Sequence, residues 1–236
     1  QMLLIHANYL DEDFRLVQGD IEIEDGKILR VGKDLPRKEE DLAVDCAGSY
    51  TGGPGLVDVP IHGCAGADTC DATREAQEAM AAFLLAHGVT SFCPTTMTTS
   101  RETIQAALLA AKDMMDHPME GGARVVGVNM EGPFIAKERK GAQKEEDILP
   151  PDFPLFQRFY EESGGIVRLV DVAPEQPGGL DFVEKASQLC TVSIAHTTAD
   201  YDQAKAAFDN GVTHATHLFN AMSGLHHRKP GVVGAV

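Results

Sequence analysis

The sequence is poor in positive charge and has no long apolar run. Lysine and arginine together number 20 against 36 aspartates and glutamates, a formal net charge of −16 over 236 residues. This balance excludes a protein that binds nucleic acid through a basic face. No stretch approaches the ~18 apolar residues that a membrane-spanning helix needs. The apolar run at Met2 is also too short for a signal peptide. We therefore expect neither a nucleic-acid partner nor a membrane partner.

Cysteine is also scarce, and its spacing is loose. The five cysteines are Cys46, Cys64, Cys70, Cys93 and Cys190. Their number is odd and no Cys-x-x-Cys pair occurs, which argues against a disulfide framework. Buried, reduced thiols are typical of a cytoplasmic protein, and we expect that location.

Two different patterns divide the chain, and residues 1–52 carry the first. Residues Asp20–Val31 alternate between polar and apolar around Asp25-Gly26, a strong hairpin signal. Such alternation leaves one face in water, as in a small antiparallel sheet. We therefore expect a small β domain over residues 1–52.

Residues 53–236 carry the second pattern, in which apolar stretches alternate with helical periodicity. Helices are expected at Arg74–His87, Arg101–Met115 and Asp200–Asn210, with Ser100 and Asp200 as N-caps. This alternation predicts a parallel sheet built from βα units. The expected strands are Leu56–His62, Val89–Thr95, Val125–Glu131, Val167–Ala173, Thr191–His196 and Thr213–Leu218.

The polar residues of this region gather where the expected strands end. They are His62, Thr95, Thr96, Glu131, Glu175, His196 and His217. No Gly-x-Gly-x-x-Gly follows the first strand, which disfavours a dinucleotide-binding fold. A (β/α)₈ barrel places its chemistry at the carboxyl ends of its strands, and a full barrel typically needs ~250 residues. We therefore predict an α/β fold, a TIM-type barrel with about six βα units present. The barrel is expected to be incomplete at the C-terminus.

Glu131, His196 and His217 each stand at the end of a different strand. Together they would form a three-ligand metal site with an open position. Alternatives remain for each residue: Glu131 could cap a helix or pair with Lys137 or Lys140, and a lone strand-end histidine is often structural. Three such residues on three strand ends jointly favour a metal. By strand alternation His214 faces away from His217, and we interpret it as structural.

Two further features concern the expected substrate pocket. Pro60 stands where many metal-dependent hydrolases have the first histidine of a His-x-His pair, so we interpret His62 as a pocket residue. The cluster from His226 to Lys229 is the one cationic group in an acidic chain, and it indicates either an anion site or a solvated loop. An arginine there, Arg228, could hold phosphate or carboxylate through two hydrogen bonds.

Several motifs occur in an order that resembles a known family along nearly the whole chain. The family is N-acetylglucosamine-6-phosphate deacetylase, within the amidohydrolase superfamily. The motifs are Pro54-Gly55-Leu56-Val57-Asp58, Gly88-Val89-Thr90-Ser91, Met130-Glu131-Gly132-Pro133-Phe134, Lys140-Gly141-Ala142, Ala173-Pro174-Glu175, Ala195-His196-Thr197 and Thr216-His217-Leu218-Phe219-Asn220-Ala221-Met222.

The resemblance implies a function and a set of site residues. The reaction is metal-dependent deacetylation of N-acetylglucosamine 6-phosphate to glucosamine 6-phosphate and acetate, in amino-sugar catabolism. The family's metal ligands match Glu131, His196 and His217. They would hold one divalent ion per subunit: zinc first, with iron, cobalt or manganese also compatible. The substrate contacts match Ala142, Asn220, Ala221 and Arg228, the last on the phosphate.

The resemblance also implies an assembly and a domain plan. The expected partner is an amino-sugar phosphate, and the expected assembly is a cytoplasmic homodimer or tetramer. Residues 1–52 would be the N-terminal part of a small β-sandwich domain, and residues 53–236 the catalytic barrel.

The chain departs from the family pattern at three points. Pro60 removes the His-x-His pair, which argues for one metal rather than two. Gln143 stands where a histidine is common, so we place it, with His62 and His227, only among possible pocket residues. The family's catalytic aspartate lies on the eighth strand, so we expect it beyond Val236.

Two other functions stay open at this point. One is another amidohydrolase-type amide hydrolase, such as a cyclic amidase or dipeptidase. Those enzymes usually keep His-x-His and often use a carbamylated lysine, and neither is apparent in this sequence. The other is a non-catalytic protein that binds a metal and a sugar phosphate, as a truncated form would.

Overall fold

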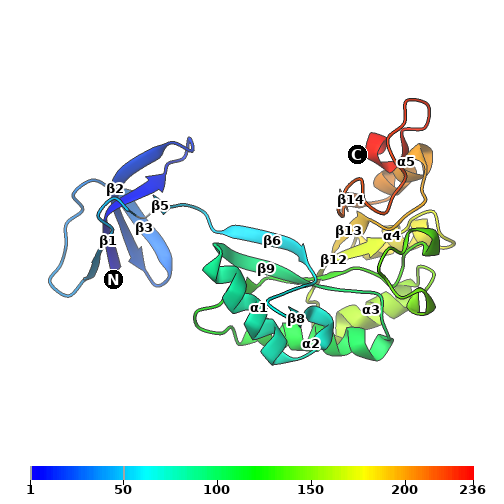
Figure 1. Ribbon diagram of the computed structural model, residues 1–236, viewed down its shortest axis with the longest axis horizontal. Helices are drawn as coiled ribbons and strands as arrows, with labels where there is room; N and C mark the ends of the chain where they lie inside the picture. Colours follow the sequence, from blue (N-terminus) through cyan, green and yellow to red (C-terminus); the bar gives the residue numbers. More distant parts are fainter. Residues whose placement is uncertain (1, 50) are drawn as a thin grey trace. The chain divides into compact units, whose positions relative to one another are not determined.

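A computed structural model describes residues 2–49 and 51–236 of the protein. The chain divides into two compact units, Gln1–Gly55 and Leu56–Val236, and each is described by itself (Figure 1). None of the helices in the described residues combines the length and the apolar character needed to cross a bilayer.

The first unit is a five-stranded sheet in the order β3-β2-β1-β4, with β5 also paired to β1. Its strands are β1 (Met2–Leu10), β2 (Leu16–Glu24), β3 (Lys27–Gly32), β4 (Leu42–Asp45) and β5 (Thr51–Gly52). The predicted hairpin is confirmed, because β2 and β3 pair antiparallel on either side of Asp25 and Gly26. A small apolar core of Ala7, Ile21 and Cys46 lies against this sheet.

The expectation of a purely antiparallel sheet is wrong. Strands β4 and β5 both run parallel to β1. Parallel neighbours need a crossover connection rather than a tight turn. The β2–β3 hairpin and the segment 33–41 together provide it. Local alternation reports only which face of a strand is wet, so it cannot reveal the direction of a partner distant in sequence.

The second unit is built on a parallel sheet whose strands follow one another in chain order. Strand β6 pairs with β9, and the order continues β9-β11-β12-β13-β14, with the short β10 also beside β9. A two-stranded ribbon of β7 and β8 follows β6. The bounds are β6 (Leu56–Ile61), β7 (Gly63–Cys64), β8 (Ala67–Asp68), β9 (Val89–Thr96), β10 (Arg124–Val125), β11 (Val128–Met130), β12 (Val167–Val172), β13 (Thr191–Ile194) and β14 (Val212–Ala215). The strand-helix rhythm and the six expected strand positions are therefore confirmed.

Helices join these strands and cover the sheet (Figure 1). The three expected helices are confirmed, and both N-caps bind as expected: Ser100 accepts from the Thr103 amide, and Asp200 forms a capping box with Gln203. The α-helices are α1 (Arg74–Ala86), α2 (Arg101–Asp116), α3 (Phe153–Glu162), α4 (Gly179–Ala186), α5 (Tyr201–Asp209) and α6 (Gly231–Ala235). Single 3₁₀ turns occur at η1 (Thr69–Asp71), η2 (Lys137–Arg139) and η3 (Glu145–Asp147).

The main core lies between the sheet and these helices. Strands β11, β12 and β13 are almost entirely buried, as expected for parallel strands that are covered on both faces. Four phenylalanines form its largest aromatic group: Phe134, Phe153, Phe156 and Phe182. A sheet held this firmly fixes where the carboxyl ends of its strands lie.

Candidate metal centre

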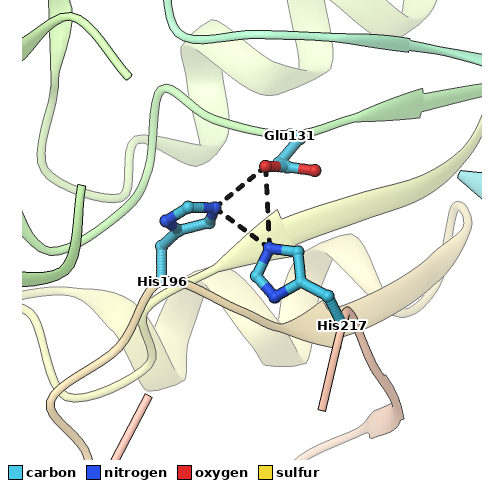
Figure 2. Close-up of side chains that lie close together, drawn as sticks. All are labelled: Glu131, His196 and His217. Carbon is cyan, nitrogen blue, oxygen red and sulfur yellow. Dashed lines mark hydrogen bonds and ion pairs between the residues drawn. The ribbon is translucent and has the colours of Figure 1, made fainter. Parts of the chain in front are cut away.

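Three side chains converge at the carboxyl ends of β11, β13 and β14 (Figure 2). Glu131 directly follows β11, and His196 and His217 each come two residues after their strands. Glu131 and His196 are 2% and 6% exposed, whereas the His217 side chain keeps 30% of its surface in water. A largely buried carboxylate that faces two imidazoles requires a specific electrostatic explanation.

The distances within this group suit a single metal ion. Glu131 Oε1 lies 2.9 Å from His196 Nε2 and 3.8 Å from His217 Nε2. The two Nε2 atoms are 3.1 Å apart. A tetrahedral zinc with ligand bonds near 2.1 Å places its ligands about 3.4 Å from one another. The three observed separations bracket that value, so one ion could contact all three atoms.

The hydrogen bonds on the far side of each imidazole fix which nitrogen carries the proton. His196 Nδ1 lies 2.7 Å from the Arg139 carbonyl oxygen, and His217 Nδ1 lies 3.1 Å from that of Asn220. A carbonyl can only accept, so each Nδ1 donates, and each neutral ring has its lone pair on Nε2. Two such lone pairs and a carboxylate facing one another fit a divalent cation at their centre.

The surroundings of Glu131 favour its ionised form. Burial alone would raise the pKa of this carboxyl. In the metal-free chain, contacts with His196, His217 and His62 in their protonated forms outweigh burial and bring the pKa well below its ordinary value. A bound ion would take the place of the proton on Nε2 of His196 and His217. His62 Nε2 lies 3.2 Å from Oε2, although no donor reaches that oxygen with hydrogen-bond geometry. The ion-pair partners of Glu131 in the described chain are histidines rather than Lys137 or Lys140.

Gln143 supports the same carboxylate. The Thr98 amide donates to Gln143 Oε1 over 2.5 Å, which leaves the Gln143 amino group to donate to Glu131 Oε1 over 2.9 Å. Gly132 allows Thr98 to lie close to the backbone that follows Glu131. Its φ is +86°, and a Cβ added at Gly132 would lie 2.1 Å from Thr98 Oγ1. Gln143 is 3% exposed, and its buried side chain contacts the carboxylate of Glu131.

The predicted substrate residues lie in two loops. The Asn220 carbonyl accepts from His217, and the Ala221 carbonyl accepts from the Thr197 amide over 3.0 Å. Arg228 lines a cavity of about 830 Å³ together with Arg139, Thr198, Ser223 and Lys229. Ala142 is exposed beside Gln143.

Two further histidines of this region stay outside the metal cluster. The His227 ring is exposed and packs on that of His226, with centroids 4.2 Å apart. His214 Nδ1 lies 2.9 Å from Ser193 Oγ. Neither belongs to the group formed by Glu131, His196 and His217.

Sequence reasoning missed Asp171, a carboxyl buried within β12. Asp171 Oδ1 accepts from Thr216 Oγ1 over 2.8 Å, and Thr216 Oγ1 also lies 2.8 Å from Ser193 Oγ. Burial, and then the nearby charge of Glu131, raises the pKa of Asp171 to about 7. The signal in the sequence was an aspartate inside a mostly apolar strand.

This raised pKa predicts a dependence of stability on pH. In the fold Asp171 keeps its proton up to about pH 7, whereas in the unfolded chain it loses the proton near its ordinary pKa of 3.8. The free energy of unfolding should therefore fall as pH rises through this window. Asp171→Asn stays neutral and removes the fall. Urea unfolding of the two metal-free proteins measures this difference. Between pH 5 and pH 8, the free energy of unfolding of Asp171→Asn should rise by roughly 2–3 kcal/mol relative to that of the wild type. Parallel pH profiles for the two proteins would contradict this prediction.

Comparisons with known proteins agree with this fold. Residues 53–235 match the amidohydrolase family model. The chain is 36% identical over 236 residues to N-acetylglucosamine-6-phosphate deacetylase from Bacillus subtilis (strain 168), covering 99% of this chain and 60% of the relative.

Two solved structures are similar over nearly the whole chain. The Pasteurella multocida N-acetylglucosamine-6-phosphate deacetylase has a TM-score of 0.87 and 26% identity, covering 99% of this chain and 61% of that one. A mutant of the Mycobacterium smegmatis deacetylase in complex with N-acetyl-D-glucosamine-6-phosphate has a TM-score of 0.85 and 29% identity. That match covers 99% of this chain and 60% of the other.

The chain thus spans about 60% of the length of these relatives. Its parallel sheet has the barrel-type fold of their structures. The family model covers most of the chain, including all three residues of the cluster. The chain belongs to the amidohydrolase family.

Proposed function

We propose that this protein deacetylates N-acetylglucosamine 6-phosphate with the help of one divalent metal ion, zinc in the first place. The observation that carries the proposal is the cluster of Glu131, His196 and His217, whose three ligand atoms lie within 4.8 Å of one another. The similarity to deacetylases from several organisms supports the choice of reaction.

The reaction breaks the amide C–N bond of the acetamido group. The oxygen of water joins the acyl carbon, and a proton reaches the departing nitrogen, which gives acetate and the amine. Glu131, His196 and His217 would hold the ion. When bound, a divalent ion polarises a carbonyl oxygen and lowers the pKa of water. We assign the proton transfer to no described residue.

Other residues of this chain would orient the metal ligands and bind the phosphate. Gln143 and the carbonyls of Arg139 and Asn220 orient the three ligands. Arg228, in the cavity it shares with Arg139 and Lys229, would pair with the phosphate. Binding energy from the phosphate, which is remote from the reacting bond, would place the acetamido group. We also propose a homodimer. In it, Arg228 could bind the phosphate of a substrate held by the neighbouring subunit.

The test is acetate release from N-acetylglucosamine 6-phosphate by purified protein, with metal, after chelation, and after metal is restored. Chelation should abolish release and zinc should restore it. Undiminished release by stripped protein would contradict the metal-dependent reaction. Metal-loaded protein that binds the sugar phosphate without releasing acetate would instead favour the non-catalytic alternative.

Arg228→Gln tests the phosphate assignment within the same assay. The variant should lower kcat/KM for the phosphorylated sugar by about 10- to 100-fold, because it loses a charge-assisted pair. It should change kcat/KM for unphosphorylated N-acetylglucosamine by less than about 3-fold. Arg124→Gln is the matched control, because Arg124 is an exposed arginine on β10 that does not line this cavity. Equal losses on both sugars would refute the assignment of Arg228 to the phosphate.

A further inference from the structure

We propose that Glu175 is a positioning residue that holds His196 in place for the metal by way of Thr197 and Thr198. Glu175 lies in the turn between β12 and α4, and its strand supplies none of the three ligands of the cluster. The inference rests on the metal centre of the proposed function, but it does not depend on which substrate the protein takes.

The carboxylate of Glu175 is bound on both oxygens to the loop after β13. Oε2 accepts from the hydroxyl of Thr197. Oε1 accepts from the Thr198 amide over 2.7 Å and from the Thr198 hydroxyl over 3.0 Å. The Gln176 side chain adds one longer contact to Oε1, at 3.4 Å. All of these donors are neutral, so this carboxylate forms a clamp on the two residues that directly follow His196.

His196 needs such a clamp because its own backbone is strained. Its φ is +44°, in the left-handed region that a residue with a side chain rarely occupies. A conformation of this kind persists only where the surrounding structure holds it. The Ala136 amide donates to the His196 carbonyl over 2.9 Å, and the Thr197 amide donates to Ala221 over 3.0 Å. Glu175 adds the hydrogen bonds that hold Thr197 and Thr198, the two residues after His196.

The position of the imidazole depends directly on this backbone. His196 Nε2 lies 2.9 Å from Glu131 Oε1 and 3.1 Å from His217 Nε2. If the bonds to Glu175 are lost, residues 197 and 198 can relax, and the strain at His196 can be released by a change in φ. The ring would then swing away from the other two ligand atoms. A ligand displaced by about 1 Å no longer meets the bond lengths that zinc requires.

A direct role of Glu175 as a metal ligand is excluded by the geometry. The group of ligand atoms that lie close enough for one ion comprises Glu131, His196 and His217. The oxygens of Glu175 are directed at the threonines instead. Its effect on the metal must therefore pass through the peptide that follows His196.

The test compares zinc affinity among Glu175→Ala, Glu175→Gln, Thr197→Val and Asp181→Ala. Affinity is measured by competition with a chelator, and the Co²⁺-substituted forms are compared by their visible absorption spectra. Asp181→Ala is the matched control, because Asp181 is an exposed carboxylate on α4 whose ion-pair partner among the described residues is Lys185. Melting temperatures of the metal-free forms record any general loss of stability.

We expect Glu175→Ala to weaken zinc binding by about 10- to 100-fold and to change the Co²⁺ spectrum. Thr197→Val should act in the same direction. In the double variant, the effect should be smaller than the sum of the effects of Thr197→Val and Glu175→Ala, because the bond between Thr197 and Glu175 is lost in both, although Thr197→Val also removes the acceptor of the Ala199 amide. Glu175→Gln keeps an acceptor for Thr198 and should recover most of the affinity. Asp181→Ala should match wild type.

A wild-type zinc affinity and an unchanged Co²⁺ spectrum in Glu175→Ala would overturn the proposal. If that variant fails to fold, Thr197→Val decides by the same criterion, since it removes one hydroxyl and keeps the shape of the side chain. If the wild-type chain itself binds no divalent ion, the proposed function fails. A wild type that binds zinc normally beside an unaffected Glu175→Ala defeats only the role of Glu175.

Discussion

Replacing Glu131 with glutamine is expected to weaken zinc binding by more than about 100-fold, beyond the 10- to 100-fold typical of an outer-shell partner. Glu131 supplies the only negative charge among the three ligand residues. The substitution keeps the shape of the side chain but removes that charge. Two imidazole lone pairs and a neutral amide attract a dication much more weakly than a set that includes a carboxylate.

Zinc titration of metal-free protein with a competing chelator measures this effect. Glu138→Gln is the matched control, because Glu138 is an exposed glutamate in η2, close in sequence to Glu131 but outside the cluster. The control should keep the wild-type affinity. If Glu131→Gln binds zinc within about 3-fold of wild type, Glu131 is not a ligand and the site described here is wrong.

Phe134→Ala is expected to lower the free energy of unfolding by about 3–5 kcal/mol. The Phe134 ring is fully buried and lies 4.9 Å from that of Phe182, centroid to centroid. Truncation removes a large apolar group and leaves a cavity among aromatic neighbours that cannot collapse fully. Phe134 also accepts from the Ala173 amide over 2.9 Å through its backbone, which the substitution leaves intact.

The same substitution links the core to the metal. Phe134 follows Glu131 by three residues, with only Gly132 and Pro133 between them, so a shift of the Phe134 backbone is expected to reach the carboxylate. Urea unfolding measures the loss of stability, and chelator competition records whether zinc affinity falls with it. Phe83→Ala, on the outer side of α1 with 42% exposure, should cost less than about 1 kcal/mol. Similar losses for both phenylalanines would contradict a core that supports the site.

Local patterns in the sequence were sufficient to predict most of the second unit. Apolar stretches bounded by helix caps such as Ser100 and Asp200 place the strands and helices, because strand burial and capping are local effects. Parallel strands then bring their carboxyl ends to one edge. That geometry predicts that Glu131, His196 and His217 lie close together.

The remaining features depend on contacts between residues far apart in the chain. The carbonyl that fixes the tautomer of His196 belongs to Arg139, 57 residues away, and a backbone carbonyl leaves no mark on side-chain pattern. The bond between Asp171 and Thr216 spans 45 residues. The parallel pairing of β4 with β1 is equally non-local. Such contacts follow from the packing of the whole sheet, and no window of the sequence contains them.

Anomalous X-ray diffraction from crystals of the zinc-loaded protein, collected at the zinc absorption edge, tests the central claim most directly. We expect one strong peak per chain, about 2.0–2.2 Å from Glu131 Oε1, His196 Nε2 and His217 Nε2. In Glu131→Gln crystals prepared in the same way, that peak should disappear or fall to a small fraction of its height. A peak elsewhere in the chain, or none at these three atoms in protein that contains one equivalent of zinc, would contradict the account.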